Sequence, residues 1–556
     1  MLPDLRLHVR QMGAPWFLRL ARASGCGTVS GANGPGDTCL LIDDDDRMAL
    51  MGVDVGTSAT KGLVMSEEGL QLALARRAYS VTFPADGRAE IDPTIVWAAV
   101  RDVMAELAAR TRDRGDMIRA IALSVSGNEA TPVDAAGRPL YQTIMGTDSR
   151  SDGIARWWEH NVGRQPVYEI TGIPVHSMHP LVRLMWLRDE KPEIYARVDK
   201  MLCWEELFAG WMGAEAATDF SLASCTMAFD IGRRRWSPRM LETAGIRPGI
   251  FPRAVPSGTP LGRVSRTLAA ELGLTVRPVV VAGGFDQPMA ALGAGQTRPG
   301  DAGVGTGSWE ALVLVVDKPR LTAEMLEAGY PFGCYVADDL CYTAANNPGG
   351  GSIVQWFRDN LGETEVRQAA LTGRDAFDLI VSQATDSPTD LVFLPHFEGS
   401  YNPWMNPWSR GNLFGLTLST TKGDIIKAIL EGITYELREN LRRLEAAGLH
   451  IGELTATGGG AKSDTWLQLK SDMTGKLVKT VNIAETGCFA AACTAGVGVG
   501  TYASVTEPIR NLVMIQRAFE PRAAHYGFYD EGANHYRMLC ETLGPLSLGR
   551  FRPGRA

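Results

Sequence analysis

ALMGVDVGTSATKGLVM, residues 49–65, consists of two apolar runs separated by a turn of small polar residues. The pattern predicts a β-hairpin. Small turn residues let backbone N–H groups approach a phosphate, and Thr57 and Ser58 add hydroxyl donors. Lys61 supplies a positive charge for outer phosphates, and Asp54 is placed to hold a hydrated Mg²⁺. Taken alone, the same residues also fit a plain hairpin with a solvated aspartate.

The composition describes a globular chain that is long enough for two domains. It has 556 residues, of which 45% are hydrophobic and 21% charged, with a net charge of −8. The body of the chain has no basic block and no uncharged apolar run near the ~18 residues of a membrane span, so neither nucleic acid nor membrane is an expected partner. The nine cysteines are scattered without a CxxC pair, which is typical of a reducing compartment. We expect a cytoplasmic protein.

Residues 1–47 differ in character from the rest of the chain. They combine an Arg-rich start, a Gly-rich stretch and the acidic run Asp43–Asp46. A transit peptide is one interpretation of the start, but the acidic run argues against it. We expect a disordered or non-native N-terminal extension, with the folded chain beginning at residue 48.

Two polar loops are candidates for substrate contacts. Ile118–Val125 predicts a buried strand, and the loop after it carries Asn128 and Glu129. Polar side chains at the end of a buried strand are where α/β proteins place ligand contacts, although a capped turn fits these residues equally well. A second polar loop, 147–150, adds Asp148.

A candidate general base follows a later strand. The β-branched run 278–282 leads into Gly283-Gly284-Phe285-Asp286-Gln287 and then into a helix of small residues. A strand that delivers an acid into a glycine-lined turn, with no cation beside it in sequence, presents a carboxylate to a substrate. Asp286 is therefore the candidate base, with Gln287 beside it. A helix N-cap is an alternative that is compatible with this role.

Residues 301–316 repeat the pattern of the opening hairpin, with Gly305-Thr306-Gly307 in the turn. This internal repeat predicts two lobes, each of which lays a glycine and hydroxyl turn against one polyphosphate. Neither this turn nor any other glycine cluster completes GxGxxG or a P-loop motif.

Two further glycine clusters are candidates for nucleotide contacts. Gly350 and Gly351 open a helix whose N–H groups suit a ribose or phosphate oxygen. Gly459 and Gly460 follow the strand 454–457 and permit a flat ring to approach the backbone, so we interpret them as an adenine seat. Lys462 and Ser463 come directly after them.

Two segments carry predictions about packing. The small polar residues of 219–230 predict a surface loop with a short strand. The helix that opens at Ser352 is expected to bury Ile353, Trp356 and Phe357 as one face.

Together these residues resemble the FGGY carbohydrate kinases, from Met48 to about Leu543. Residues 178–190 match one long family pattern, with Arg183 where lysine is usual, and residues 411–431 match a second pattern throughout. The shorter matches are the opening Asp54-x-Gly56-Thr57-Ser58-x-x-Lys61, the Gly-Gly-x-Asp at 283–286, and GGGAKS at 458–463, which looks like the xylulokinase version.

The resemblance implies an α/β fold of two ribonuclease-H-like (actin-like ATPase) domains with a central cleft. It implies an N-terminal domain over 48–297 that binds sugar, a nucleotide-binding domain over 298–545, and a flexible tail over 546–556. The expected cofactors are ATP and Mg²⁺, and the resemblance allows a homodimer. By analogy, Asp286 is the catalytic base, Asp54 organises the metal, and the substrate contacts are Asn128, Glu129, Asp148, Asp286 and Gln287. The expected nucleotide contacts are Thr57, Ser58, Lys61, Gly305, Thr306, Gly307, Gly350, Gly351, Gly459, Gly460, Lys462 and Ser463.

The identity of the substrate that would accept the phosphate is less well defined. Xylulokinases show Ser-Gly-Gln-Met-His at the first sugar loop, where this chain has Ser126-Gly127-Asn128-Glu129-Ala130. Glycerol kinases have an Arg-Glu pair there and a glutamine after the base, as Gln287 is here. We expect a pentulose of the xylulose type, with a glycerol- or erythritol-type polyol or a sugar acid as alternatives. A non-catalytic actin-like ATPase or a sugar sensor is the alternative of another class.

Overall fold

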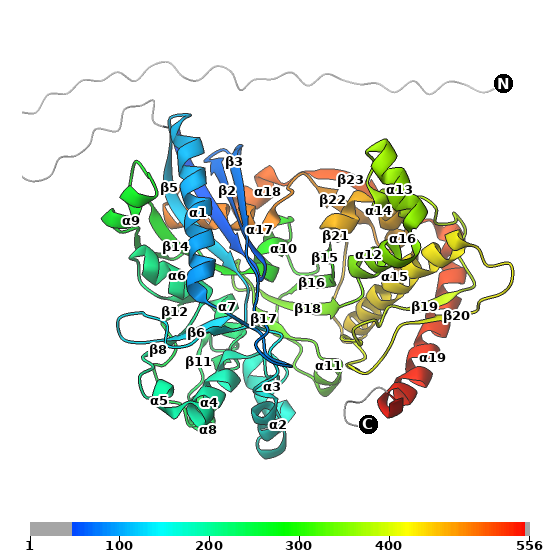
Figure 1. Ribbon diagram of the computed structural model, residues 1–556, viewed down its shortest axis with the longest axis horizontal. Coiled ribbons are helices and arrows are strands. Elements are labelled where there is room, and N and C mark those ends of the chain that lie inside the picture. Colours follow the sequence, from blue (N-terminus) through cyan, green and yellow to red (C-terminus); the bar gives the residue numbers. More distant parts are fainter. Residues whose placement is uncertain (1–46, 551–556) are drawn as a thin grey trace, which may run out of the picture. The chain divides into compact units, whose positions relative to one another are not determined.

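The computed structural model describes residues 47–550, with side chains through Leu546 (Figure 1). The predicted extension over 1–47 thus lies outside the described residues, except for Arg47. Both large sheets belong to one compact unit. Among the described residues, none of the helices is long and apolar enough to cross a membrane.

The first large sheet contains the opening hairpin. Its strand order is β13-β14-β5-β1-β2-β3, in which β1, β2 and β3 are antiparallel neighbours while β5 and β14 run parallel to β1. The predicted hairpin is confirmed, and β3 extends it as a third antiparallel strand. The strands are β1 (Arg47–Val55), β2 (Ala59–Ser66), β3 (Gln71–Ala78), β5 (Asp116–Val125), β13 (Pro260–Arg263) and β14 (Val279–Phe285).

The second large sheet repeats this topology around the second hairpin. Its order is β17-β18-β16-β15-β21-β22-β23, in which β15, β16 and β18 are antiparallel neighbours while β21 and β22 run parallel to β15. The predicted internal repeat is therefore a repeat of sheet topology. The strands are β15 (Ala302–Thr306), β16 (Glu310–Val316), β17 (Phe332–Cys334), β18 (Cys341–Asn347), β21 (Leu454–Thr457), β22 (Val478–Val481) and β23 (Ile515–Phe519).

Four smaller sheets complete the strand pairing. They contain β4 (Glu90–Ile91), β6 (Ala130–Val133), β7 (Thr143–Ile144) and β8 (Lys200–Cys203); β9 (Thr218–Asp219) and β12 (Ala254–Val255); β10 (Phe229–Asp230) and β11 (Arg235–Trp236); and β19 (Val392–Leu394) and β20 (Asn412–Phe414).

The helices of the N-terminal half include α1, which lies along β2 and β3 (Figure 1). The Asp92 side chain caps α1 by accepting from the Thr94 N–H, and Pro93 is its first residue. These helices are α1 (Pro93–Arg112), α2 (Asp152–Asn161), α3 (Arg164–Thr171), α4 (Pro180–Glu190), α5 (Pro192–Tyr195), α6 (Trp204–Met212), α7 (Phe220–Ser224), α8 (Pro238–Ala244), α9 (Arg266–Glu271) and α10 (Asp286–Gly293).

In the C-terminal half, α17 is the helix that joins the two parts of the fold, because it contacts β1, β5, β14 and α10 of the first half. Its apolar residues on every side suit this buried position. The helices are α11 (Ala323–Glu327), α12 (Gly351–Leu361), α13 (Glu363–Thr372), α14 (Ala376–Val381), α15 (Lys422–Ala446), α16 (Asp464–Thr474), α17 (Thr486–Gly498), α18 (Thr506–Leu512) and α19 (Tyr526–Arg550), with 3-10 turns η1 (Gly459–Lys462) and η2 (Ala523–His525).

The α19 helix extends to Arg550, past residue 546, where we expected a flexible tail to begin. Residues 551–556 lie outside the described range.

Both packing predictions need correction. Residues 219–230 do not form a surface loop, because nearly all of them are buried. The Asp219 carboxylate has hydrogen-bond partners inside the protein, since it caps α7 by accepting from the N–H groups of Ser221 and Leu222. In α12, Ile353 and Phe357 are buried as expected, but Trp356 is 41% exposed because it sits at the edge of that face.

Candidate active site

A cavity of about 330 Å³ is lined by residues from both large sheets. It brings together five of the predicted site residues, namely Asp54, Lys61, Asp286, Gln287 and Gly305. The other lining residues are Ala290, Ala291, Ala294, Gln296, Gly303, Ala311, Val313, Thr457, Gly458, Ala484, Glu485, Thr486 and Gly487. The N- and C-terminal halves of the chain therefore build this cavity jointly.

Three parallel strands end beside one another at the cavity. Asp54 in β1 pairs with Ser124 in β5, and Ser124 pairs with Gly284 in β14. The loop to Glu129 follows β5, and Asp286 follows β14 directly. Because the carboxyl ends of parallel strands meet at one edge of a sheet, three acids from distant parts of the sequence gather there.

Asp286 is the first residue of α10, and its N-cap is Phe285. The alternative that Asp286 itself caps the helix is therefore wrong by one residue, since Phe285 has the extended backbone of a cap. Burial raises the pKa of Asp286 well above its usual range, and the negative charges of Asp54 and Glu129 raise it further. A carboxylate with a raised pKa is better matched to accepting a proton near neutral pH.

Asp54 is held by the neighbouring strand. The Ser124 hydroxyl donates to Asp54 Oδ1 at 2.6 Å. Burial raises the pKa of Asp54, against the lowering effects of the Ser124 hydrogen bond and the Lys61 charge. A Cβ at Gly487 would lie 3.0 Å from the same oxygen, so the start of α17 leaves no room for a side chain there.

The Asp54 carboxylate is a hard oxygen donor on the cavity wall, which is the chemistry Mg²⁺ prefers. Within residues 47–546, no group of three or more His, Cys, Asp or Glu side chains could hold a metal ion. These residues therefore fit a Mg²⁺ that has one protein ligand and takes its other oxygens from phosphates and water.

Lys61 lines the cavity, but it has a partner that the sequence did not indicate. Its Nζ lies 2.7 Å from Glu485 Oε2, so the ion pair joins β2 to the residue before α17. Burial disfavours the charged amine, but the hydrogen bond and charge of Glu485 outweigh it and raise the pKa of Lys61. The cation expected to meet phosphate thus also ties the two halves together.

The turns of the two hairpins differ. Thr57 and Ser58 are exposed in the first turn, which is closed by the Gly56 N–H donating to the Ala59 carbonyl at 3.1 Å. In the second turn, Thr306 is 1% exposed and its hydroxyl donates to Glu310 at 3.0 Å. The Thr306 hydroxyl therefore forms its hydrogen bond inside the protein and does not face the cavity as a free donor.

Gly350 and Gly351 pack against that second turn. The Gly351 N–H donates to the Gly307 carbonyl at 2.8 Å, and a Cβ at Gly350 would lie 2.6 Å from the Trp309 carbonyl carbon. Neither Gly307 nor this start of α12 lines the cavity, but the hydrogen bond places both beside the residues that do. The absence of side chains is what lets the two backbones meet.

The predicted adenine seat is next to Gly458, which lines the cavity with a φ of 84°. A Cβ at Gly459 would meet open space, whereas one at Gly460 would lie 2.5 Å from Thr306 Cγ2. Lys462 is exposed, and Ser463 caps α16 by accepting from the Trp466 N–H at 3.3 Å. This segment thus adjoins the second turn.

The first substrate loop is rigidly held. Glu129 is 2% exposed, and its carboxylate accepts from the N–H groups of Asn128 and Gly146, each at 3.1 Å. The Asn128 side-chain oxygen is buried and has no hydrogen-bond partner among the described residues. A buried acceptor of this kind requires a donor, which a bound water molecule or a ligand hydroxyl can supply.

Arg183 explains how two loops stay together. Its guanidinium is fully buried and donates to the backbone carbonyls of Asn128, Ile144 and Met145 at 2.5, 2.6 and 2.5 Å. Burial lowers the pKa of Arg183 to about 10, so it stays charged at neutral pH. A fork of N–H donors can bridge several carbonyls, which a single ammonium does less well.

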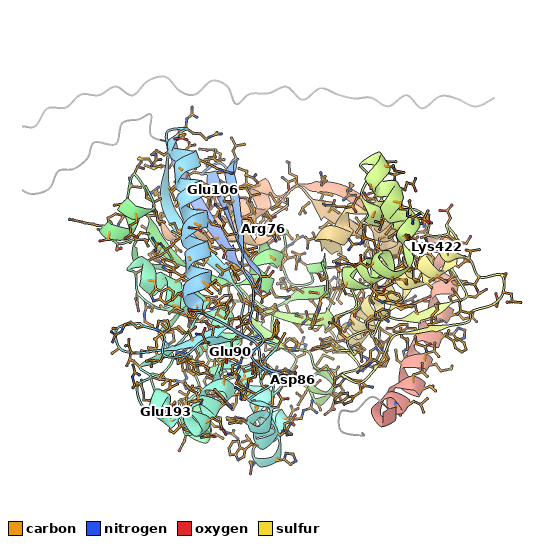
Figure 2. All side chains as sticks on the ribbon, in the orientation of Figure 1. Arg76, Asp86, Glu90, Glu106, Glu193 and Lys422 are labelled. Carbon is orange, nitrogen blue, oxygen red and sulfur yellow. The ribbon has the colours of Figure 1, made fainter. Side chains whose placement is uncertain are left out.

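Asp148 does not line the cavity. Its carboxylate is buried, forms an ion pair with Arg150 at 2.6 Å and accepts from the Ala89 N–H at 2.7 Å. Arg150 also pairs at 2.6 Å with Glu90, which Figure 2 labels. Hydrogen bonds from Arg150 and Ala89 hold the pKa of Asp148 below its usual range against the opposing effect of burial. The structure thus places Asp148 among the supports of the loop.

Sequence reasoning missed the stretch 484–487, which contributes a continuous part of the cavity wall. No site residue was expected there, yet Glu485 is the N-cap of α17, and Thr486 and Gly487 are its first two residues. A polar and glycine-containing segment at a helix start was a usable signal. Gln296 was also missed, and nothing local in its sequence pointed to it.

Comparison with known proteins places the chain in a family. Residues 49–293 match the N-terminal domain, and residues 303–499 the C-terminal domain, of the FGGY family of carbohydrate kinases. The gluconokinase of Bacillus subtilis (strain 168) is 30% identical over 449 residues, which cover 80% of this chain and 86% of that protein. The xylulose kinase of Staphylococcus epidermidis (strain ATCC 12228) is 26% identical over 504 residues, covering 90% and 98%.

Among solved structures, a ligand-bound xylulose kinase from Lactobacillus acidophilus is similar with a TM-score of 0.83 and 23% identity, covering 91% of this chain and all of that one (100%). This likeness shows the fold, which is that of the actin-like ATPases. Kinases of this family use ATP as the phosphate donor. The chain belongs to the FGGY family of carbohydrate kinases and is an ATP-dependent sugar kinase.

Proposed function

We propose that this kinase phosphorylates a hydroxyl of a small sugar, ketose or polyol, with Asp286 as general base and Mg-ATP as donor. The observation that carries the proposal is the position of Asp286 and Asp54 on the wall of one cavity, at the ends of neighbouring strands. A base for the acceptor and a ligand for the metal are the two acids that phosphoryl transfer requires.

In the proposed reaction, the acceptor oxygen attacks the γ-phosphorus of ATP while Asp286 takes the hydroxyl proton, and ADP leaves. Asp54 would hold the Mg²⁺, which neutralises phosphate charge when bound. Lys61 would share its charge between Glu485 and the phosphates. Most of the rate enhancement then comes from alignment and charge neutralisation, because the protein itself forms no bond.

We propose that the nucleotide lies along the two turns and the glycine segment that adjoins them. The proposed contacts in this group are Thr57, Ser58, Lys61, Gly305, Thr306, Gly307, Gly350, Gly351, Gly459, Gly460, Lys462 and Ser463. Because the Thr306 hydroxyl donates to Glu310, the contact at Thr306 would come from its backbone.

The acceptor would contact Asn128, Glu129, Asp286 and Gln287, with Asp148 acting through the loop that it supports. A pentulose of the xylulose type is the first choice, and a glycerol- or erythritol-type polyol or a sugar acid is the alternative. The curated relatives carry the names gluconokinase, xylulose kinase and glycerol kinase, so their names span all three choices.

The same proposal includes domains over 48–297 and 298–545, which is supported by the division of the two large sheets between these ranges. It also includes a homodimer and a cytoplasmic location. The seven described cysteines are all buried and free, which supports a reducing compartment.

The test replaces Asp286 with asparagine, which keeps the size of the side chain and removes its basicity. We expect kcat to fall by about 10²–10⁴-fold, the usual contribution of a general base, while calorimetric affinity for ADP stays within about twofold. The matched control is Glu193→Gln, which removes an exposed carboxylate on α5 outside the cavity wall.

Retention of full turnover by Asp286→Asn would show that another group takes the proton. A sugar sensor predicts a different result, in which the unmutated chain binds sugar but releases no ADP with any member of a panel of ketoses, polyols and aldonates.

A further inference from the structure

We propose that the acceptor is an uncharged polyol or ketose, and that sugar acids are rejected by the carboxylates of Glu129 and Asp286. The inference rests on the proposed function, since it concerns the acceptor of that reaction. It removes one of the three alternatives that the sequence and the names of relatives leave open.

The first argument is the charge of the site. Glu129 and Asp286 follow the neighbouring parallel strands β5 and β14, whose ends are in register at Val125 and Phe285. The loop after β5 packs tightly on the end of β14, because a Cβ at Gly127 would lie 2.6 Å from the Phe285 ring. Glu129 and Asp286 are close enough for the charge of one to raise the pKa of the other. Asp286 lines the cavity, whereas Glu129 is buried and does not line it, so an acceptor carboxylate in the cavity would meet the charge of Asp286 directly and that of Glu129 from behind the wall.

The second argument concerns the cations. Lys61 is the only Lys or Arg among the described residues that line the cavity, and it pairs with Glu485 at 2.7 Å. Arg183 lies near Glu129, but its guanidinium is 0% exposed and donates to three backbone carbonyls. Arg150 is enclosed between Asp148 and Glu90. Lys61 and Arg150 are thus paired with carboxylates, and Arg183, whose Nε has no hydrogen-bond partner among the described residues, is fully buried and does not line the cavity.

The third argument is the kind of hydrogen bond that the site offers. Besides the two carboxylates, the loop presents the Asn128 side-chain oxygen, which is buried and has no partner among the described residues. The carboxylates and this oxygen are acceptors, while the Gln287 and Gln296 amides on the cavity wall can both donate and accept. Polyol and ketose hydroxyls donate to acceptors, whereas an ionised carboxylate has no proton to donate. The site therefore matches the chemistry of uncharged acceptors.

The test compares pairs that differ only in the terminal group, D-glucitol with D-gluconate and xylitol with xylonate, beside D-xylulose. ADP release gives kcat/KM for each compound, and calorimetry in the presence of ADP gives its affinity. At an effective dielectric constant of about 20, one like charge a few ångströms away costs more than about tenfold in affinity. We therefore expect the kcat/KM and the affinity of the uncharged member of each pair to exceed those of its acid by at least about tenfold. An acid that equals or exceeds its polyol overturns the proposal.

A variant identifies the residue responsible. Glu129→Gln removes one charge and keeps the shape of the side chain, so the ratio of kcat/KM for the polyol to kcat/KM for the acid should shrink by about tenfold. The control is Glu193→Gln, at the residue labelled at the lower left of Figure 2, which should keep the ratio of the unmutated protein. An undiminished ratio in a folded Glu129→Gln protein would remove Glu129 from the proposal. The paired assay on the unmutated protein stands even where the variant does not fold.

The outcomes separate the two proposals. Faster phosphorylation of gluconate than of glucitol overturns the inference and keeps the kinase. Binding that favours the polyols without any ADP release overturns the proposed reaction and keeps the acceptor preference. The absence of both binding and turnover across every pair overturns both.

Discussion

Ser124 donates a hydrogen bond to Asp54 at 2.6 Å, and the two residues are paired across β5 and β1. The strand register therefore places an orienting hydroxyl directly beside the acid that lines the cavity. The other side of Asp54 faces Gly487, at the start of α17. The orientation of this carboxylate depends on three segments that are far apart in the sequence.

We expect Ser124→Ala to weaken the use of Mg²⁺. The variant loses the bond that orients Asp54, and it also loses an interaction that lowers the pKa of this acid, so the pKa rises further and the charged form is less favoured. The Mg²⁺ concentration for half-maximal activity should rise by about 3- to 10-fold with little change in the KM for the acceptor. Loss of a hydrogen bond to a metal ligand usually weakens metal binding by at least that factor. Titration of Mg²⁺ at fixed ATP measures the effect. Ser66→Ala at the end of β2 is the control, and an unchanged Mg²⁺ requirement would contradict the prediction. Removal of Mg²⁺ with EDTA should abolish turnover in both proteins.

We expect Glu129→Gln to move the acidic limb of the pH profile. Asp286 must be unprotonated to act as base, so kcat/KM falls as the pH drops through its raised pKa. Removal of the Glu129 charge lowers the pKa of Asp286, and the limb should therefore lie at lower pH in the variant. Profiles of kcat/KM between about pH 5 and 9 measure this shift. Glu193→Gln should leave the limb in place, and a limb that moves upward in Glu129→Gln would contradict the assignment of the base.

We expect Glu206 to make the stability of the fold depend on pH. Burial raises the pKa of Glu206 from 4.5 to about 7. The folded state thus binds more protons than the unfolded state between these values, so the free energy of unfolding falls as the pH rises from about 4.5 to about 7. Glu206→Gln lacks this loss and should gain roughly 3 kcal/mol relative to the unmutated protein over that interval. Urea unfolding at about pH 5 and about pH 8 measures the difference. A difference between the two proteins that does not change with pH would show that Glu206 titrates normally.

We expect the buried ion pair beneath the second turn to be costly to break. The side chains of Lys470 and Glu310 are 1% and 3% exposed. Lys470→Met leaves Glu310 buried and unpaired, which should cost about 3–5 kcal/mol of unfolding free energy. The same change should raise the KM for ATP, because Glu310 also accepts from the Thr306 hydroxyl.

The control for that pair is Lys479, which pairs with Glu453 at side-chain exposures of 21% and 51%. Lys479→Met should cost no more than about 1 kcal/mol, because exposed pairs contribute little. Chemical denaturation measures both variants. The double variant Lys470→Met with Glu310→Leu should recover most of the lost stability, and a failure to recover would mean that packing of the lysine matters more than its charge.

Much of the fold was accessible from local patterns. The alternation of apolar runs and glycine turns predicted both hairpins, because these signals act within a few residues. The same reasoning failed at 219–230 and at Trp356, where burial is decided by what packs on the segment. It also missed Glu485, which meets Lys61 across 424 residues of sequence.

The sequence by itself determined the repeated strand and turn units, the identity of the acids at 54, 129 and 286, and the membership of the family, because short-range patterns and ordered motifs carry this information. Only the tertiary structure decided which side chains face the cavity. It turned Thr306 inward, placed Asp148 in a buried ion pair and brought residues 484–487 to the cavity wall. Strand register and helix packing set these positions, and both depend on contacts between residues that lie far apart along the chain.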